Sequence, residues 1–146
     1  MPADLVARIE AVLQDHPSLR GEVATDAEIE AAQQALGMVL DPQYVAFIKR
    51  FGGSYAGTTI QAFRNGSLVG RETVTEMTLA FRDAWAEDPL QALEAALVIS
   101  DDGSGNAILI NAKGEVVLHL HDENEVEPLF PSLYDMMDAW LPCAGS

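Results

Sequence analysis

The chain has 146 residues, 49% of them hydrophobic, and carries 8 Lys and Arg against 23 Asp and Glu, a formal charge of −15. This length and apolar content predict one folded domain and exclude a disordered chain. The negative charge repels phosphate backbones and anionic lipid headgroups, so we expect neither a nucleic-acid partner nor membrane binding. A single cysteine, Cys143, excludes an internal disulfide framework. Without a leader-like start or an apolar span, we expect a cytoplasmic protein.

The acidity is unevenly distributed. Residues 1–75 carry a net charge of −3, whereas residues 76–146 carry 2 basic and 14 acidic side chains, a net charge of −12. Such an asymmetry serves solubility, and it also suits a basic protein partner.

Three amphipathic helices are predicted in the first third of the chain. Apolar residues recur at helical spacing before Pro17, which must end the first helix. Thr25 and Glu28 have the capping-box spacing that begins the second helix, and Gly37 is a typical C-terminal stop. The Asp-Pro pair at 41–42 begins the third helix, because Asp is a good N-cap and Pro is well tolerated in the first turn.

The remaining elements are strands and two further helices. Two short strands, at 58–63 and 68–69, flank Asn65-Gly66, a dipeptide that favours a tight hairpin turn. Runs of apolar and β-branched residues predict a three-stranded antiparallel meander at 97–99, 107–110 and 116–121.

The fourth helix begins at a second capping box on Thr73 and ends near Pro89, and a closing helix follows an N-cap at Ser132. Trp85 and Trp140 lie on the apolar stripes of these two helices, so we expect both to be largely buried.

This order of elements predicts an α+β fold in a single domain spanning 1–146. Short connections make the sheet mostly antiparallel, with about five strands and with helices packed on one face. The other face, or its loops, would then be available for a partner.

Several residues could carry chemistry. His119 and His121 share a face if both lie on a strand, which would begin a metal site, but no third ligand is evident. The segment 101–106 resembles a calcium loop, yet its glycines stand where ligands are needed, which favours a structural turn. No nucleophile motif is present. We therefore expect no catalytic residues, no cofactor and no metal, with an enzyme or metal protein built around the two histidines as an alternative.

A run of acids after the last predicted strand is the other notable feature. Four acidic residues fall within six positions with no basic residue among them, which describes a solvated loop or an electrostatic docking surface for a cationic partner. The candidate partner-binding residues are Asp122, Glu123, Glu125, Glu127, Asp101, Asp102 and Tyr55.

Three segments form an ordered pattern. The first contains Ile29, Ala32, Leu36, Gly37, Leu40, Pro42, Tyr44, Phe47, Ile48 and Gly53. The second runs from Ile99 to Asn106 and continues with Ile108 and Gly114-Glu115-Val116, and the third runs from Ser132 to Leu141. Together they resemble the SUKH superfamily, which includes fungal cell-wall-assembly regulators and many bacterial immunity proteins of polymorphic toxin systems. The resemblance covers about 25–141 and leaves 1–24 as an N-terminal helical extension.

This resemblance implies a small α+β binding domain without catalytic residues. It implies a cytosolic immunity protein that neutralises a cognate toxin by direct protein binding, and the acidic second half implies a toxin with a basic surface. The alternative is a regulatory or scaffold module that binds a cellular protein.

Overall fold

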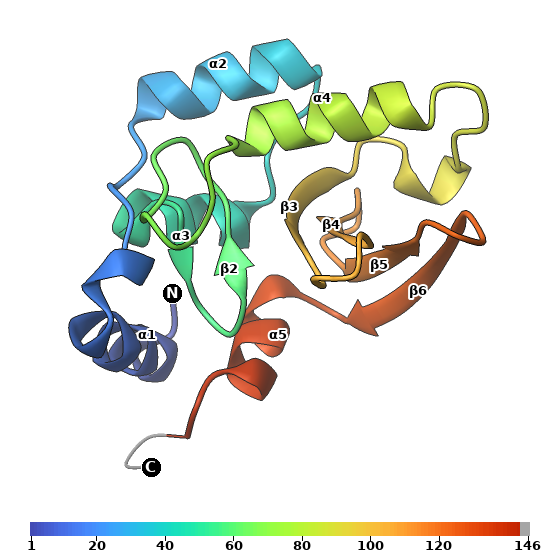
Figure 1. Cartoon of the computed structure of the whole chain (residues 1–146). Coiled ribbons are helices and arrows are strands. Elements are labelled where there is room, and N and C mark those ends of the chain that lie inside the picture. The colour runs from blue at the N-terminus through green and yellow to red at the C-terminus, as the bar shows by residue number, and fades with distance from the viewer. Residues whose placement is uncertain (144–146) are drawn as a thin grey trace.

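The computed structural model describes residues 1–143 (Figure 1). Its helices are α1 (Ala3–Asp15), α2 (Asp26–Leu36), α3 (Pro42–Phe51), α4 (Val74–Ala84) and α5 (Leu133–Trp140), with short 3-10 turns η1 (Pro17–Leu19) and η2 (Gln91–Leu93). Its strands are β1 (Ser54–Tyr55), β2 (Thr59–Ile60), β3 (Leu97–Asp101), β4 (Ala107–Ile110), β5 (Val116–Leu120) and β6 (Glu125–Phe130).

The strands form two antiparallel sheets, which confirms the α+β class. β1 and β2 make a two-stranded sheet, and β3-β4-β5-β6 make a four-stranded meander in chain order. Because each strand of a meander reverses direction, the β3–β4 and β5–β6 loops leave the same end of the sheet. The β4–β5 turn leaves the opposite end.

Both faces of the four-stranded sheet are covered, so the prediction of helices on one face is wrong. Ile99, Ile108 and Val116 belong to the large core that also contains residues of α1, α2, α3 and α5. Leu109 and Val117 point the other way, into a smaller cluster with side chains of α4. The cause lies in the strands, whose unbroken apolar runs leave a hydrophobic side chain on each face.

The predicted hairpin around Asn65 is also wrong. The hairpin is formed by β1 and β2, and its turn comprises residues 56–58. The Asn65 side chain instead accepts a hydrogen bond from the Ala62 backbone N–H at 2.8 Å. The Gly66 N–H donates to the Gly53 carbonyl at 2.8 Å. These bonds hold the Asn-Gly pair in a loop that packs against the end of α3.

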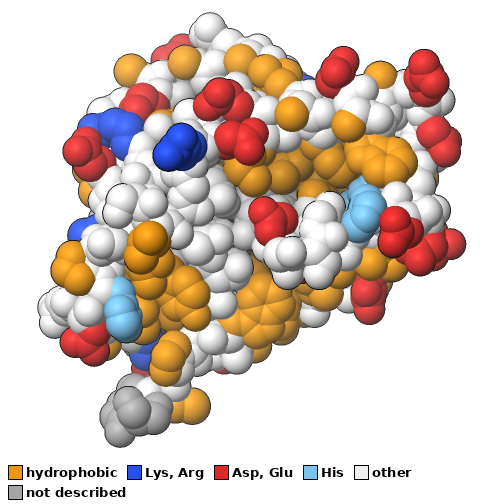
Figure 2. Space-filling view, in the orientation of Figure 1, with side chains coloured by type: hydrophobic (Ala, Val, Ile, Leu, Met, Phe, Trp, Pro, Cys, Tyr) orange, Lys and Arg blue, Asp and Glu red, His pale blue; other side chains and the backbone are white. Residues whose placement is uncertain are grey.

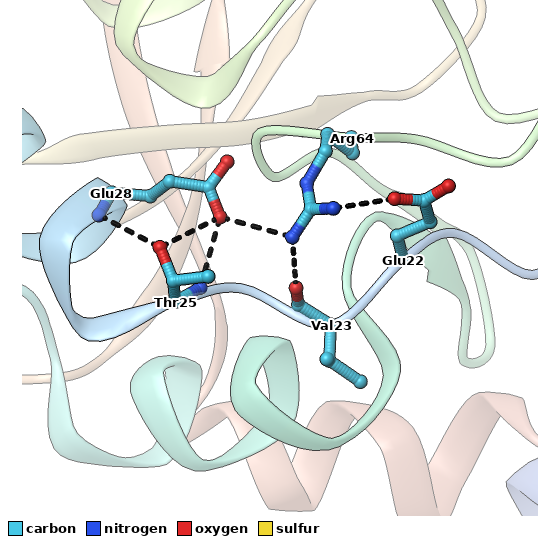
Figure 3. A network of polar contacts seen from close by, with 5 residues as sticks. All are labelled: Glu22, Val23, Thr25, Glu28 and Arg64. Atoms are coloured by element: carbon cyan, nitrogen blue, oxygen red, sulfur yellow. Dashed lines mark hydrogen bonds and ion pairs between the residues drawn. The ribbon is translucent and has the colours of Figure 1, made fainter.

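Arg64 fixes the same loop to the beginning of α2 (Figure 3). Its guanidinium donates to the carboxylate of Glu22, to the carbonyl oxygen of Val23 at 2.6 Å and to the carboxylate of Glu28 at 3.2 Å. Glu28 also accepts from the backbone N–H of Thr25, the largest cause of a lowered Glu28 pKa. The loop is therefore part of the helical half of the molecule rather than a free hairpin.

The predicted helix starts are confirmed. Both capping boxes are present, at the beginnings of α2 and α4. The Asp41 carboxylate accepts from the N–H groups of Gln43 and Tyr44, each at 3.1 Å. The Ser132 hydroxyl accepts from the N–H of Asp135 at 3.2 Å.

The expected burial of the two tryptophans is found in part for Trp85 and is not found for Trp140. Trp140 is 37% exposed, because it is the last residue of the short helix α5 and packs on one side against the ring of Phe130, 5.3 Å away. The core positions of α5 are taken by other residues, among them Met137. Trp85 is half-buried at the end of α4 and contacts the ring of His119.

A buried arginine ties α1 to the end of α5. Arg8 is only 8% exposed and donates to the backbone carbonyls of Pro142 (3.0 Å), Asp138 (2.8 Å) and Leu141 (3.1 Å). It also forms ion pairs with the carboxylates of Asp138 and Asp4. The side chain therefore satisfies carbonyls that a helix C-terminus leaves without an intrahelical partner.

Candidate functional site

The two acidic segments singled out in the sequence meet at one end of the four-stranded sheet. The β3–β4 loop (residues 102–106) and the β5–β6 turn (residues 121–124) lie side by side there. Asn106 joins them, because its Oδ1 atom accepts from the backbone N–H of His121 at 3.0 Å and lies 2.6 Å from the Nδ1 atom of the same residue. We refer to the two loops, together with Asp101 and the acids of β6, as the acidic end of the sheet.

The β3–β4 loop is a structural turn, as predicted. The Asp101 carboxylate accepts from the N–H of Gly103 at 2.7 Å. Asp102 accepts from the N–H of Ser104 at 2.8 Å and from the side-chain amide of Asn106 at 2.9 Å. The bond from Asn106 is the largest cause of a lowered Asp102 pKa, so this bond stabilises the charged carboxylate. The glycines of the turn adopt positive φ angles that other residues rarely adopt.

The acids of the second segment divide between a turn and a strand. Asp122 and Glu123 are exposed in the β5–β6 turn, and Asp122 lies 3.2 Å from the ring of His121. Glu125 and Glu127 lie on β6, which the sequence interpretation treated as a loop. Because they are two residues apart on a strand, their exposed side chains share one face of the sheet edge.

The loops and strand positions of the acidic end contain no Lys or Arg. Within residues 1–143, the acids at 101, 102 and 122–127 form no ion pair with Lys or Arg. The only Lys or Arg after Arg82 in the sequence is Lys113, which lies in the β4–β5 turn at the opposite end of the sheet. In Figure 2, red acidic side chains gather over the right-hand part of the surface, where Figure 1 shows the β5–β6 turn, and most of the blue lies to the left.

The structure adds two residues that sequence reasoning missed. Asn124 adopts a φ of 51°, and its side-chain amide donates to both the backbone carbonyl and the carboxylate of Asp88, each at 3.0 Å. Asp88 follows α4 and is thereby brought to the acidic end from a distant part of the chain. An asparagine among acids between two strands is a recognisable turn signal, but its partner could not be read from the sequence.

His119 and His121 do not form a shared site. His119 is buried, with its ring against those of Phe81 (5.0 Å) and Trp85 (4.6 Å) and its Nε2 atom 2.7 Å from Oδ1 of Asn124. It lines a pocket of about 570 Å³ between α4, η2 and the sheet. Across residues 1–143, no three His, Cys, Asp or Glu side chains gather in a way that could hold a metal ion.

Tyr55 does not join the acidic residues. It is half-buried on β1 and lines a different cavity, of about 510 Å³, together with residues of α1 such as Arg8 and Val12. Of the seven candidate contact residues, six therefore belong to one surface and Tyr55 belongs to another.

The comparison with protein families decides the relationship. A sequence model of the SMI1 / KNR4 family (SUKH-1) matches residues 23–139. The chain belongs to the SUKH-1 family. The match includes every residue of the acidic end, and it leaves α1 outside the SUKH-1 region. No curated protein matches the chain.

Membership of SUKH-1 is consistent with a protein-binding role of the immunity type. No helix among residues 1–143 has the length and apolar character needed to cross a membrane.

Proposed function

We propose that this SUKH-1 protein is a cytoplasmic immunity protein that neutralises a cognate toxin by direct, non-catalytic binding through the acidic end of its four-stranded sheet. One observation carries the assignment of the surface. Two acidic loops, far apart in the sequence, are hydrogen-bonded to each other through Asn106 and His121 and contain no Lys or Arg.

The physical action of such a surface is electrostatic. Its carboxylates attract a basic partner over roughly one Debye length, which is about 8–10 Å at physiological ionic strength. Complementary charge raises the association rate and disfavours wrong partners. Because hydrogen bonds already hold the loops, little conformational entropy is lost when the partner docks.

The proposal is tested with the product of the gene immediately upstream. Expression of that product alone should arrest growth, and co-expression with this chain should restore growth and yield a complex that survives purification. If the upstream product is harmless and forms no complex, the immunity function is wrong. Recovery of a stable complex with a cellular protein instead would support the scaffold alternative.

A further inference from the structure

A cleft beside the acidic end is lined by an exposed tryptophan. It has a volume of about 440 Å³ and lies between the β1–β2 turn, the β3–β4 loop and the end of α5. Its lining includes Gly57, Asp101, Asp102, Ile108 and Trp140. Figure 2 shows hydrophobic surface over α5, which borders the cleft. The cleft therefore combines an aromatic ring, an apolar floor and two carboxylates.

Trp140 is held firmly although it is exposed. Its ring meets that of Phe130 edge to face, at 5.3 Å and 86°. The β1–β2 turn packs against the base of the same side chain, because a Cβ added to Gly57 would lie only 2.8 Å from the Trp140 Cβ. Gly57 also has a φ of 92°, which favours glycine at this position. The ring is thus positioned before any partner binds.

The two carboxylates beside the tryptophan can still bind a cation, because neither forms an ion pair within the described residues. In Asp101, Oδ1 accepts from Gly103, whereas Oδ2 has no hydrogen-bond partner within residues 1–143. Asp102 accepts a bond from Asn106 that lowers its pKa and so favours the charged form. Among the described residues, no Lys or Arg makes a cation–π contact with the Trp140 ring. The cation–π contacts found there are those of Arg20 and Arg50, and both are made to Phe51.

We propose that this cleft receives a cationic side chain, arginine or lysine, from the protein partner, with Trp140 contacting the cation and Asp101 and Asp102 neutralising it. The inference rests on the proposed function, since it names the group with which the basic partner is anchored. An indole ring attracts a cation placed over its face, and tryptophan and arginine are enriched among the residues that dominate interface energies. An anionic group would be repelled by the two aspartates, and a purely apolar group would leave their negative charge unneutralised and Oδ2 of Asp101 without a hydrogen-bond donor.

The test uses the full chain and amidated hexa-arginine as the probe, followed by NMR of the ¹⁵N-labelled protein. Hexa-citrulline is the matched control, because it keeps the planar head group and lacks the charge. We expect hexa-arginine to shift the indole N–H signal of Trp140 saturably, and we expect hexa-citrulline to leave it in place. The indole signal of Trp85, on the far side of the sheet, is the internal comparison and should move less than that of Trp140.

Two variants separate cation binding in the cleft of Trp140, Asp101 and Asp102, here called the anchor, from the general attraction of the acidic surface for a basic peptide. Trp140→Leu keeps apolar bulk and should weaken hexa-arginine binding by about threefold, the size of an exposed cation–π contact. Trp85→Phe should bind as the parent does. Asp101→Asn should also weaken hexa-arginine binding, and it tests the cleft independently if Trp140→Leu does not give a folded spectrum. The matched control for Asp101→Asn is Glu30→Gln, which removes one charge at a remote position.

The outcomes distinguish this inference from the function on which it rests. If hexa-arginine shifts amide signals of residues 121–127 while the Trp140 indole stays unmoved, or if Trp140→Leu binds as tightly as the parent, the anchor is overturned and the acidic docking surface remains. If no signal moves at all, the anchor is overturned as well. The immunity function is decided separately, by growth rescue with the upstream gene product.

Discussion

Asn106 and His121 couple the two acidic loops through one amide oxygen. Oδ1 of Asn106 accepts both the backbone N–H of His121, at 3.0 Å, and the hydrogen on the ring Nδ1, at 2.6 Å. The amide nitrogen of the same side chain donates to Asp102 at 2.9 Å. One side chain therefore sets the geometry of the β3–β4 loop and its distance from the β5–β6 turn.

Replacement of Asn106 by alanine removes all three bonds. We expect Asn106→Ala to lower the free energy of unfolding by about 1 kcal/mol, the usual net value of a side-chain hydrogen bond that is lost without burying a charge. The pKa of Asp102 should rise toward its ordinary value, because the bond from Asn106 is the main cause of its lowering. Urea denaturation and NMR titration of the Asp102 carboxyl measure the two effects.

The pH dependence of this effect has a definite sign. The pKa of Asp102 is lower in the folded protein than in the unfolded chain, so its charged form contributes to the free energy of unfolding at neutral pH. This contribution is lost as the pH falls below the ordinary pKa of about 4 and then through the lowered pKa of the folded protein. The difference in stability between parent and Asn106→Ala should therefore shrink on acidification through that window. A constant difference from pH 7 to pH 2 would show that the Asp102 charge is not involved.

Calcium should not shift the melting temperature of the parent, because the β3–β4 loop is a structural turn whose glycines stand where calcium ligands are needed.

Arg8 connects α1, which precedes the SUKH-1 match, to α5 within it. We expect Arg8→Met to lower the urea midpoint clearly, because three backbone carbonyls at the end of α5 lose their donor. Asp138→Asn should have a much smaller effect, since the Asp138 side chain is 69% exposed and its backbone carbonyl is retained. Equal midpoints for Arg8→Met and the parent would mean that the bonds from Arg8 to the end of α5 do not stabilise the fold.

The two ends of α5 should respond differently to truncation. Met137 is fully buried, and Met137→Ala should cost about 2–5 kcal/mol of unfolding free energy. Trp140 is 37% exposed, so Trp140→Ala should cost less, about 1–2 kcal/mol, despite its larger side chain. Guanidinium denaturation of both variants checks the order, and a larger loss for Trp140→Ala would place that ring in the core.

The features that sequence reasoning predicted correctly are mostly local. Helix caps involve residues three positions apart, so Thr25 with Glu28 can be recognised without knowledge of the fold. Three of the four strands of the meander, β3, β4 and β5, were also predicted, because their apolar runs are bounded by glycine-containing turns. In each case the deciding contacts lie within a few residues of one another.

The failures have non-local causes. β6 was missed because Glu125, Glu127 and Pro128 disfavour a strand, and only pairing with β5 selects it. The Asn65-Gly66 hairpin was predicted wrongly because the Asn65 amide is taken by the backbone of its own loop. Trp140 lies on an apolar stripe, but whether the end of such a stripe is covered depends on the neighbouring elements.

The candidate site shows the same division. The acids were identified from composition, but their union at one end of the sheet depends on the meander topology and on Asn106. Asp88 was missed because its link to Asn124 spans 36 positions. Tyr55 was grouped with the acids although β1 places it in a different cavity.

Whether the acidic end is the docking surface is tested with one variant that removes charge there and a control that removes equal charge elsewhere. The variant carries Asp122→Asn, Glu123→Gln, Glu125→Gln and Glu127→Gln. Asp101 and Asp102 cannot serve as the control, because they belong to the same end of the sheet. The control carries Asp15→Asn, Glu22→Gln, Asp26→Asn and Glu30→Gln, which lie on and around α1 and α2.

The most direct measurement is the association rate with the upstream gene product across a series of salt concentrations. We expect the variant at residues 122–127 to associate roughly tenfold more slowly than the parent at low salt and to show a flatter salt dependence. The control should keep most of the parent's rate and slope. If the variant and the parent associate at the same rate with the same salt dependence, the acidic end is not the docking surface.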